Sequence, residues 1–383
     1  MRMELTMRIA DLSGISTAMS RREFAKMTAL GLASQALPEV LAQAAGRKVG
    51  YCVIGLGRIA DHFMRGVHDS STSQITGLVS GHRDKALRIA AQYGVPESSI
   101  YSYEQIDAFR DNKTIDAVYV ALPNSMHAEY TIRSAKAGKH VLCEKPMSTT
   151  VADAEAMIAA CKAAKVKLMI AYRLHYEPTT LRAIELIREG NLGKVQAIVS
   201  ANGFNIKPGE WRATKTMGGG GPLLDVGIYE LNAARYLTGE EPASFTAALS
   251  TIDRDGRFDA VEENTAWTIK FPSGALASCN TTYGASMPGF YRVYGSKGWL
   301  EVDVFSYQNL HLRANYKSPD PNAPAITLDE LNPEKDPKQF VREADHFSAC
   351  ILEDREPKTP GEEGLRDMRY MQQIYRAAGV TAL

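Results

Sequence analysis

The sequence has few cysteines, and their arrangement is uninformative for cross-linking. There are five, an odd number, and no two form a C-x-x-C pair. Disulfide frameworks and zinc sites need closely spaced cysteines, or cysteines combined with histidines at short spacing. We therefore expect neither a disulfide scaffold nor a metal site. The cysteines are Cys52, Cys143, Cys161, Cys279 and Cys350.

The sequence also lacks an excess of charge of either sign. It has 44 basic and 44 acidic residues in 383, with no long block of one sign. Nucleic acids and anionic membrane surfaces attract basic patches, so neither is an expected partner. A hydrophobic fraction of 45% is enough for a substantial core. The composition favours an enzyme that acts on a small molecule, in two domains.

No stretch has the length of a membrane span, which needs about 20 apolar residues. The apolar stretch 27–42 is interrupted by a proline and an acid, and it follows Arg21-Arg22 and ends in Ala42-Gln43-Ala44. Twin arginines, a short apolar region and an A-x-A site predict a twin-arginine signal peptide over residues 1–44. The alternative is a disordered or amphipathic N-terminal helix. Export in the folded state by the twin-arginine machinery predicts a periplasmic protein without a membrane anchor.

From Lys48 to Ile170, strand-like and helix-like runs alternate, which predicts βαβ units and a parallel doubly wound sheet in a domain covering residues 46–170. The expected strands are Val49–Ile54, Gln74–Val79, Asp116–Leu122, His140–Cys143 and Lys167–Ala171. The expected helices are Ala60–Asp69, Lys85–Tyr93, Ala128–Ala137 and Val151–Ala164.

In residues 171–383 the pattern of expected elements changes to longer strands joined by tight turns such as Ser273-Gly274. They predict a second, α+β domain with a large, open, mostly antiparallel sheet. Strands are expected at Val195–Asn202, Ala243–Ile252, Asn264–Phe271, Ala275–Tyr283, Gly289–Gly295 and Gly298–Val304. Helices are expected at Thr179–Glu189, Asp225–Leu237, Arg342–Leu352 and Gly364–Ala378, and a surface loop at 305–336.

A glycine-rich turn follows the first strand and opens the first helix. It reads Gly55-Leu56-Gly57-Arg58-Ile59-Ala60, a G-x-G-x-x-A pattern. Gly55 permits the tight turn, and Gly57 lets a pyrophosphate approach the backbone at the helix N-terminus. This context predicts a dinucleotide site. A purely structural glycine turn is the alternative.

The end of the second strand indicates which dinucleotide. An NAD site usually carries an acid there, about 20 residues after the glycines. This chain has Ser80, followed by Arg83 and Lys85. A hydroxyl and two cations suit a 2′-phosphate, so we expect NADP rather than NAD. Asp84 is the nearest acid and can also cap the next helix, and the two cations can also be a solvated helix start.

Two further loops lie at the carboxyl ends of predicted parallel strands, where open α/β sheets bind ligands. The first is Leu122-Pro123-Asn124-Ser125-Met126-His127, and the second is Cys143-Glu144-Lys145-Pro146-Met147. A lysine held there by a following proline can lie near a nicotinamide. By composition alone, a Glu-Lys-Pro triplet is more simply a surface turn.

With Asn124, His127 and Glu144-Lys145-Pro146, the chain resembles the glucose–fructose oxidoreductase, inositol dehydrogenase and rhizopine-catabolism superfamily. The resemblance runs from about residue 48 to the C-terminus. The stretches 171–178, 218–229 and 235–242 are similar to the branch of glucose–fructose and aldose–aldose oxidoreductases.

The resemblance implies roles for the matching residues. Lys145 would be the cation beside the acid–base group and would hold a sugar hydroxyl. Asp225 and Tyr229 match the pattern D-x-G-x-H, with tyrosine as the acid–base group where many members have histidine. A typical inositol dehydrogenase is therefore disfavoured. Tyr176 would join Lys145, Asp225 and Tyr229 as a sugar contact.

Other matching residues would contact the cofactor. They are Leu122, Pro123, Asn124, His127, Glu144, Lys145, Arg173, Trp211 and Arg212. Asp225 and Tyr229 are four residues apart, so one helix face would present both to the cleft.

The resemblance implies a ping-pong reaction with tightly bound NADP: an aldose is oxidised to an aldonolactone, and a second sugar is reduced to an alditol. A conventional dehydrogenase with a dissociable cofactor, and a non-catalytic sugar-binding protein, are the alternatives. The predicted cleavage site leaves only a few residues before the first strand, too few for the long arm of glucose–fructose oxidoreductase. We therefore expect a homodimer on the open sheet, with a tetramer as the other possibility.

Overall fold

The computed structural model describes residues 46–303 and 305–380, so the predicted signal peptide lies outside the described residues. From Lys48 onward the chain forms one compact unit. Because chain contacts do not separate the two predicted domains, their limits at residues 46–170 and 171–383 stay predictions. Within the described residues, no helix combines the length and apolar character that crossing a membrane requires.

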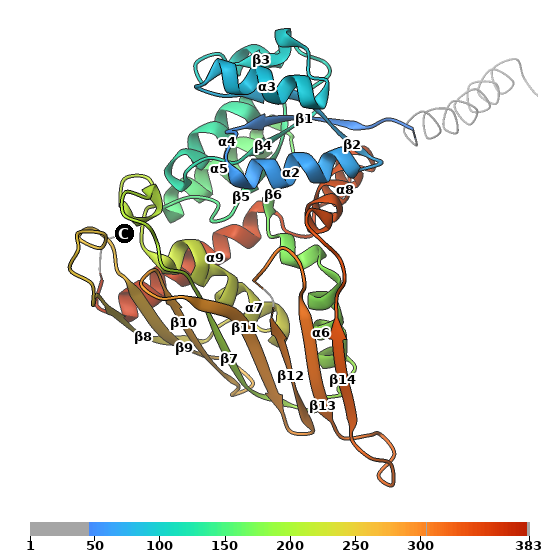
Figure 1. Cartoon of the computed structure of the whole chain (residues 1–383), viewed down its shortest axis with the longest axis vertical. Helices are drawn as coiled ribbons and strands as arrows, with labels where there is room; N and C mark the ends of the chain where they lie inside the picture. Colours follow the sequence, from blue (N-terminus) through green and yellow to red (C-terminus); the bar gives the residue numbers. More distant parts are fainter. Residues whose placement is uncertain (1–45, 304, 381–383) are drawn as a thin grey trace, which may run out of the picture. The chain divides into compact units, whose positions relative to one another are not determined.

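Six parallel strands form the first sheet, in the order β3-β2-β1-β4-β5-β6 (Figure 1). They are β1 (Val49–Ile54), β2 (Ser73–Val79), β3 (Ile100–Tyr101), β4 (Ala117–Val120), β5 (His140–Glu144) and β6 (Leu168–Ala171). The helices between them are α2 (Arg58–Asp69), α3 (Arg83–Tyr93), α4 (His127–Lys136) and α5 (Val151–Ala164). Every residue of β1, β4 and β6 is buried, as expected for a sheet covered on both faces. The predicted Rossmann-type fold is confirmed.

Eight strands form the second sheet, in the order β14-β13-β12-β11-β7-β10-β9-β8. Only β7 and β10 pair in parallel; the other neighbours are antiparallel. The strands are β7 (Val195–Gly203), β8 (Ser244–Ser250), β9 (Asn264–Lys270), β10 (Leu276–Thr282), β11 (Met287–Gly295), β12 (Gly298–Asp303), β13 (His311–Tyr316) and β14 (Ile326–Leu331). The predicted open, mostly antiparallel sheet is confirmed.

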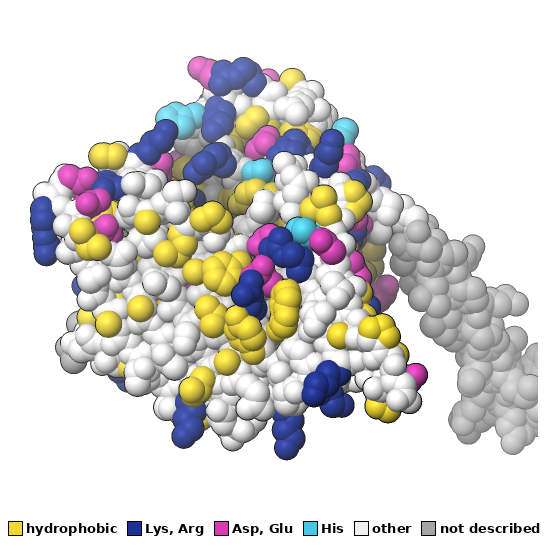
Figure 2. All heavy atoms as spheres, turned by 60° about the horizontal axis from the view of Figure 1, so that its bottom comes forward, with side chains coloured by type: hydrophobic (Ala, Val, Ile, Leu, Met, Phe, Trp, Pro, Cys, Tyr) yellow, Lys and Arg dark blue, Asp and Glu magenta, His cyan; other side chains and the backbone are white. Residues whose placement is uncertain are grey.

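Helices cover one face of the second sheet: α6 (Pro178–Arg188), α7 (Ile228–Thr238) and α9 (Gly361–Ala377) (Figure 1). Burial alternates along strands such as β9 and β13, so their other face is more exposed. Exposed apolar side chains on this sheet include Val199, Leu276 and Tyr294. Hydrophobic side chains also gather beside charged ones on the surface turned forward in Figure 2.

The end of the chain returns to the first sheet. Helix α8 (Lys338–Leu352) packs on α2 and also touches β1 and β2. Helix α9 packs on α5 and β6 as well as on β8. The C-terminal helices therefore join the two sheets.

One predicted element was wrong, and one predicted helix begins differently from expectation. The surface loop expected at 305–336 contains β13 and β14, because alternate residues of β13 are buried and Ile326 and Leu328 of β14 pack partly against the core. The helix expected from Asp225 instead begins with one π-helical turn, Leu223–Gly227, and becomes α-helical at Ile228. The short strand β3 was not predicted.

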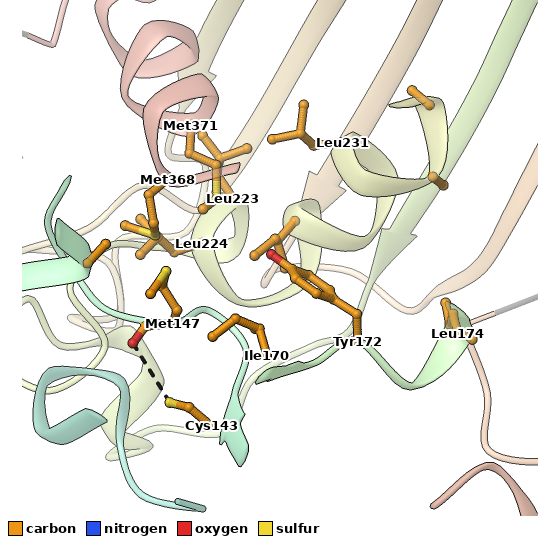
Figure 3. Close-up of a cluster of buried hydrophobic side chains, with 14 of the residues drawn as sticks. Cys143, Met147, Ile170, Tyr172, Leu174, Leu223, Leu224, Leu231, Met368 and Met371 are labelled. Atoms are coloured by element: carbon orange, nitrogen blue, oxygen red, sulfur yellow. Dashed lines mark hydrogen bonds between the residues drawn. The ribbon is translucent and has the colours of Figure 1, made fainter. Parts of the chain in front are cut away.

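Elements of both sheets meet in one hydrophobic cluster (Figure 3). It combines residues from the ends of β5 and β6 with residues from the π-helical turn and from α9. Those labelled in Figure 3 are Cys143, Met147, Ile170, Tyr172, Leu174, Leu223, Leu224, Leu231, Met368 and Met371. Each buried leucine or methionine contributes about 2 kcal/mol. Since Lys145 lies between two of these residues and Asp225 directly follows two others, the same core holds both.

Candidate active site

The glycine turn between β1 and α2 has the geometry of an anion cradle. Gly55 has φ +88°, and a Cβ added there would lie 2.6 Å from the carbonyl oxygen of Ala121. A Cβ added to Gly57 would meet nothing within 4 Å, and no side chain caps the N-terminus of α2. The backbone N–H groups at this end are thus open to a ligand. The residues fit the pyrophosphate of a dinucleotide.

The other residues of this turn divide between core and surface. Leu56 is buried in the core on the α2 side of the sheet, Ile59 packs partly against that core, and Arg58 is exposed. The turn therefore presents backbone rather than side chains to the space in front of α2.

The end of β2 brings the predicted 2′-phosphate residues together only in part. The Ser80 hydroxyl accepts from His82 N–H at 3.1 Å, and Lys85 is exposed with no ion pair among the described residues. Arg83 forms a 2.5 Å ion pair with Glu97 in which both side chains are more than half exposed. Arg83 must exchange this partner to bind a phosphate, which costs little because exposed ion pairs are weak.

Lys145, Asp225 and Tyr229 converge although 80 residues separate the first two. Lys145 Nζ donates to the Asp225 carbonyl oxygen at 2.6 Å and lies 3.3 Å from its carboxylate. The same ammonium lies 4.4 Å from the centre of the Tyr229 ring. The Lys145–Pro146 peptide bond is cis. The π-helical turn brings Asp225 to Lys145, and the first turn of α7 brings Tyr229.

The Asp225 carboxylate is held by three donors. Besides Lys145, Tyr283 donates to Oδ2 at 2.7 Å, and Arg212 Nε lies 3.2 Å from the same oxygen. Burial by itself would raise the pKa of Asp225, but the two cations and the tyrosine outweigh it and leave this pKa below its usual range. Asp225 is therefore an anion that fixes Lys145.

Tyr283 was not predicted, and nothing in the order of residues pairs it with a position 58 residues earlier. The only signal was its place at the end of a predicted strand.

Burial lowers the pKa of Lys145, whereas Tyr229, Asp225 and Glu144 raise it, and the net pKa is above the usual lysine value. Lys145 is accordingly a cation at neutral pH. It places a positive charge against the Tyr229 ring.

Glu144 precedes Lys145 and has partners of its own. Its carboxylate accepts from the Tyr119 hydroxyl at 2.5 Å and from the Lys145 backbone N–H at 3.2 Å. Burial raises the pKa of Glu144, and Tyr119 and Lys145 oppose that rise. In the structure Glu144 orients the lysine backbone.

Arg173 is a second cation beside Tyr229, with its guanidinium 5.3 Å from the centre of the ring. It is buried and donates to the carbonyl oxygens of Ser306 and Phe305 at 2.8 and 3.3 Å, and to Gln339. Arg173, predicted as a cofactor contact, therefore lies beside Tyr229 and is held by contacts that the sequence did not indicate.

The side chains of Asn124 and His127 form hydrogen bonds with backbone carbonyl groups of neighbouring loops. Asn124 donates to the carbonyl oxygen of Gly218 at 2.9 Å, which links the first sheet to the glycine-rich loop. His127 is 1% exposed, and both its ring nitrogens lie 2.8 Å from carbonyl oxygens, those of Pro146 and Leu122. Burial lowers its pKa. The prediction of His127 as a cofactor contact needs correction, because neither nitrogen is left for a ligand.

The prediction of Tyr176 as a sugar contact also needs correction. It is 6% exposed, and its hydroxyl bonds to the Thr359 hydroxyl at 3.1 Å within the core on the α2 side. The structure does not bring it to Lys145, Asp225 or Tyr229. The short helical turn after β6 directs Arg173 toward the centre and Tyr176 away from it.

The remaining predicted cofactor contacts border the site. Leu122 lies beside Gly55, where its Cδ2 would be 2.7 Å from an added Cβ, and Pro123 follows it. Trp211 stacks with Arg212 at 4.4 Å, on the loop that reaches Asp225. Among the described residues, no group of histidine, cysteine and acidic side chains is arranged to hold a metal ion.

Comparison with known proteins gives consistent matches. Residues 49–172 match the model of an oxidoreductase family with an NAD-binding Rossmann fold, and residues 180–301 match the GFO/IDH/MocA C-terminal domain. The crystal structure of aldose-aldose oxidoreductase from Caulobacter crescentus is 46% identical, with a TM-score of 0.81 over 87% of this chain and 98% of that chain.

Two further relatives bind NADP according to their descriptions. D-xylose 1-dehydrogenase [NADP(+)] of Haloarcula marismortui is 31% identical over 86% of this chain and 91% of its own length. A 3-ketoreductase from Actinomadura kijaniata in complex with NADP is 25% identical, with a TM-score of 0.74 over 86% of this chain and 98% of that chain. Two family models in sequence order and these relatives, together with the site geometry, show that the chain belongs to the GFO/IDH/MocA family of oxidoreductases.

Proposed function

We propose that this protein is an NADP-dependent sugar oxidoreductase that oxidises an aldose at C1 to the aldonolactone and reduces a second sugar to an alditol, in ping-pong fashion with a tightly bound cofactor. The observation that carries the proposal is the convergence of Lys145, Asp225 and Tyr229 in a chain that also has an open glycine turn before α2. The likeness to an aldose-aldose oxidoreductase over nearly all of that chain supports the two-sugar reaction.

The side chains would divide the work as follows. Tyr229 removes the proton of the anomeric hydroxyl, and in the second half-reaction it returns a proton to the second sugar. Lys145 and Arg173 place two positive charges beside Tyr229, and Asp225 keeps Lys145 in position. The backbone around Gly57 would hold the pyrophosphate of NADP, which when bound supplies the hydride acceptor.

The choice of NADP is supported by the absence of an acid at Ser80 and by the exposed Lys85. Ser80→Asp places a carboxylate where a 2′-phosphate would lie, so we expect it to weaken NADP binding about 100-fold and NAD binding much less. Titration of both cofactors by fluorescence measures this. Equal loss for both would show that Ser80 does not select the cofactor.

A conventional NADP-dependent sugar dehydrogenase that releases its cofactor in each turnover is the second candidate. The match to D-xylose 1-dehydrogenase [NADP(+)] favours it. The two candidate functions differ in whether the purified protein retains bound NADP.

One experiment separates them. The protein is purified without added cofactor, its absorbance is checked for bound nicotinamide, and it is then incubated with glucose or xylose alone and with glucose plus fructose. The proposed reaction gives bound nicotinamide and equal amounts of lactone and alditol. A dehydrogenase gives product only with added NADP, and no product from any sugar pair with or without NADP would indicate a non-catalytic sugar-binding protein.

The location and assembly belong to the same proposal. Export with NADP already bound suits the periplasm, where soluble NADP is not regenerated. Replacing Arg21 and Arg22 with lysine should keep the protein in the cytoplasm, which cell fractionation tests. Sedimentation of the purified protein tests the proposed homodimer, for which the open face of the second sheet offers the surface.

A further inference from the structure

The segment Phe305–Tyr307, which follows β12, turns inward and is not the surface loop expected from its composition. Its backbone is fastened by side chains from the first sheet and from α8. Arg173 donates to the carbonyl oxygens of Phe305 and Ser306, and Gln339 donates to that of Ser306 at 3.3 Å. The Phe305 ring lies 5.7 Å from the Tyr229 ring. The segment therefore contacts the acid–base residue directly.

Tyr307 ends this segment, and its ring is held on the side of the dinucleotide helix. It lies 4.4 Å from the His62 ring of α2, 4.5 Å from the Arg173 guanidinium and 5.8 Å from the Phe340 ring of α8. These contacts fix the direction of the side chain. They leave its hydroxyl as the group able to meet a ligand.

The Tyr307 hydroxyl shares the electrostatic surroundings of the reacting centre. Arg173, Tyr229, Lys145 and Glu144 all lie close enough to act on its ionisation. It has no hydrogen-bond partner among the described residues, and it is not among their fully buried polar atoms. Tyrosine hydroxyls in such positions usually bond to a ligand or to water, since an unpaired hydroxyl loses a hydrogen bond.

We propose that Tyr307 is a specificity-determining residue whose hydroxyl bonds to a ring hydroxyl of the sugar that presents its anomeric hydroxyl to Tyr229. The inference rests on the proposed function. A polyol suits this site because Lys145, Tyr229 and Tyr307, a donor and two donor–acceptor groups, are neighbours of one another. Arg173 connects the two tyrosines, since its guanidinium lies against both rings.

The direct test is Tyr307→Phe, which keeps the ring and removes only the hydroxyl. We expect the dissociation constant and the KM of the preferred sugar to rise about tenfold, with kcat within about twofold. The ranking of sugars that differ at a single hydroxyl should also change. Bound NADP and the thermal midpoint should stay as in the wild type.

A second variant tests the segment without changing Tyr307. A Cβ at Gly289 would lie 2.5 Å from the Phe305 ring and 2.8 Å from its Cβ, so Gly289→Ala should displace Phe305 and raise the KM in the same direction. The matched control is Tyr294→Phe, which removes a tyrosine hydroxyl that lies on β11 and is 38% exposed. It should leave KM unchanged.

Calorimetric binding of glucose and xylose to the NADP-loaded protein separates failure of this proposal from failure of the proposed function. If wild-type protein binds sugar without turning it over, the function is wrong but the Tyr307→Phe comparison still applies. Equal sugar affinity and equal sugar ranking in Tyr307→Phe and wild type would overturn the assignment. Loss of bound NADP in Tyr307→Phe, with sugar ranking unchanged, would also overturn it, because Tyr307 would then serve the cofactor.

Discussion

The two sheets of this protein differ in how many of their residues are buried. Strands of the first sheet such as β1 and β4 are buried throughout, between α2, α3 and α8 on one face and α4 and α5 on the other. In the second sheet, β9 and β13 bury only every other residue. The fully buried strands β1, β4 and β6 contain no charged side chain, whereas polar side chains occur along the whole of β9 and β13.

The candidate site contains residues from two regions, one around the first sheet and one around the second. Glu144 is the last residue of β5, Lys145 follows it, and Arg173 lies just after β6, at the carboxyl ends of the parallel strands. Asp225 and Tyr229 come from the segment that opens α7, and Tyr283 directly follows β10. The first region supplies most of the positive charge, and the second supplies the Asp225 anion and the Tyr229 hydroxyl that we propose as the acid–base group.

The largest effect should come from breaking the contact between the regions. Tyr229→Phe and Lys145→Met should each lower kcat by about 10³-fold, because one removes the proton-transfer group and the other the charge beside it. Bound NADP and the thermal midpoint should change little in Tyr229→Phe. Steady-state kinetics also test the double variant, which should be no worse than about the poorer single variant if the two act as a unit. Near-full turnover of Tyr229→Phe would remove the acid–base assignment.

The next largest effects are expected at the glycine turn of the first region, where one substitution should change stability and the other should change NADP binding. Gly55→Ala should lower the free energy of unfolding by about 2 kcal/mol or more, because φ is +88° and the new Cβ meets a carbonyl oxygen. Gly57→Ala should leave stability nearly unchanged, yet weaken NADP binding about tenfold by filling open space in the cradle. Urea unfolding and cofactor titration measure the pair. Undiminished NADP affinity in Gly57→Ala would mean that the cofactor lies elsewhere.

A smaller effect is expected from the hydrogen bond that Tyr283, in the second region, donates to the Asp225 carboxylate. Tyr283→Phe removes a hydrogen bond to a buried carboxylate and should cost about 2 kcal/mol of stability. Because this bond helps lower the pKa of Asp225, its loss should raise that pKa and move the acid limb of the pH–rate profile to higher pH. Tyr294→Phe again serves as the control. A profile that does not move would show that the ionisation of Asp225 does not limit the reaction.

The smallest effect is a pH dependence where the two regions meet. His175 follows β6 and bonds to Asn232 of α7 at 2.7 Å, and burial lowers its pKa to about 4. The unfolded chain takes up this proton near pH 6.5, so the stability contributed by neutral His175 is complete above that pH and is lost as the pH falls toward 4.

We expect His175 to account for about 1–2 kcal/mol of the loss in unfolding free energy between pH 7 and pH 5. His175→Gln should remove that part, as measured by urea unfolding at both pH values. His346, whose pKa is also lowered to about 4, should retain its own contribution. An unchanged pH dependence in His175→Gln would contradict the assignment.

Prediction from the sequence succeeded where the signal was local. The limits of β1 and α5 agree with those expected, because an apolar run and a Thr150 cap define them within a few residues. It failed at β13 and β14, which lie in a stretch rich in proline, asparagine and aspartate but place apolar residues against the core. It also failed for Tyr176 and His127, since neither residue type tells which partner takes its polar atoms.

The order of residues alone determined the alternation of strands and helices, the open backbone at Gly57 and the chemical types of Lys145, Asp225 and Tyr229. These depend on periodicity and on side-chain chemistry, which are properties of neighbours in the chain. The tertiary structure decided that Tyr283 and Arg212 hold Asp225, that Arg173 lies between Tyr229 and Tyr307, and that a segment after β12 reaches α2. Such contacts join positions tens of residues apart, and they form only when burial of the shared core has brought both sheets together.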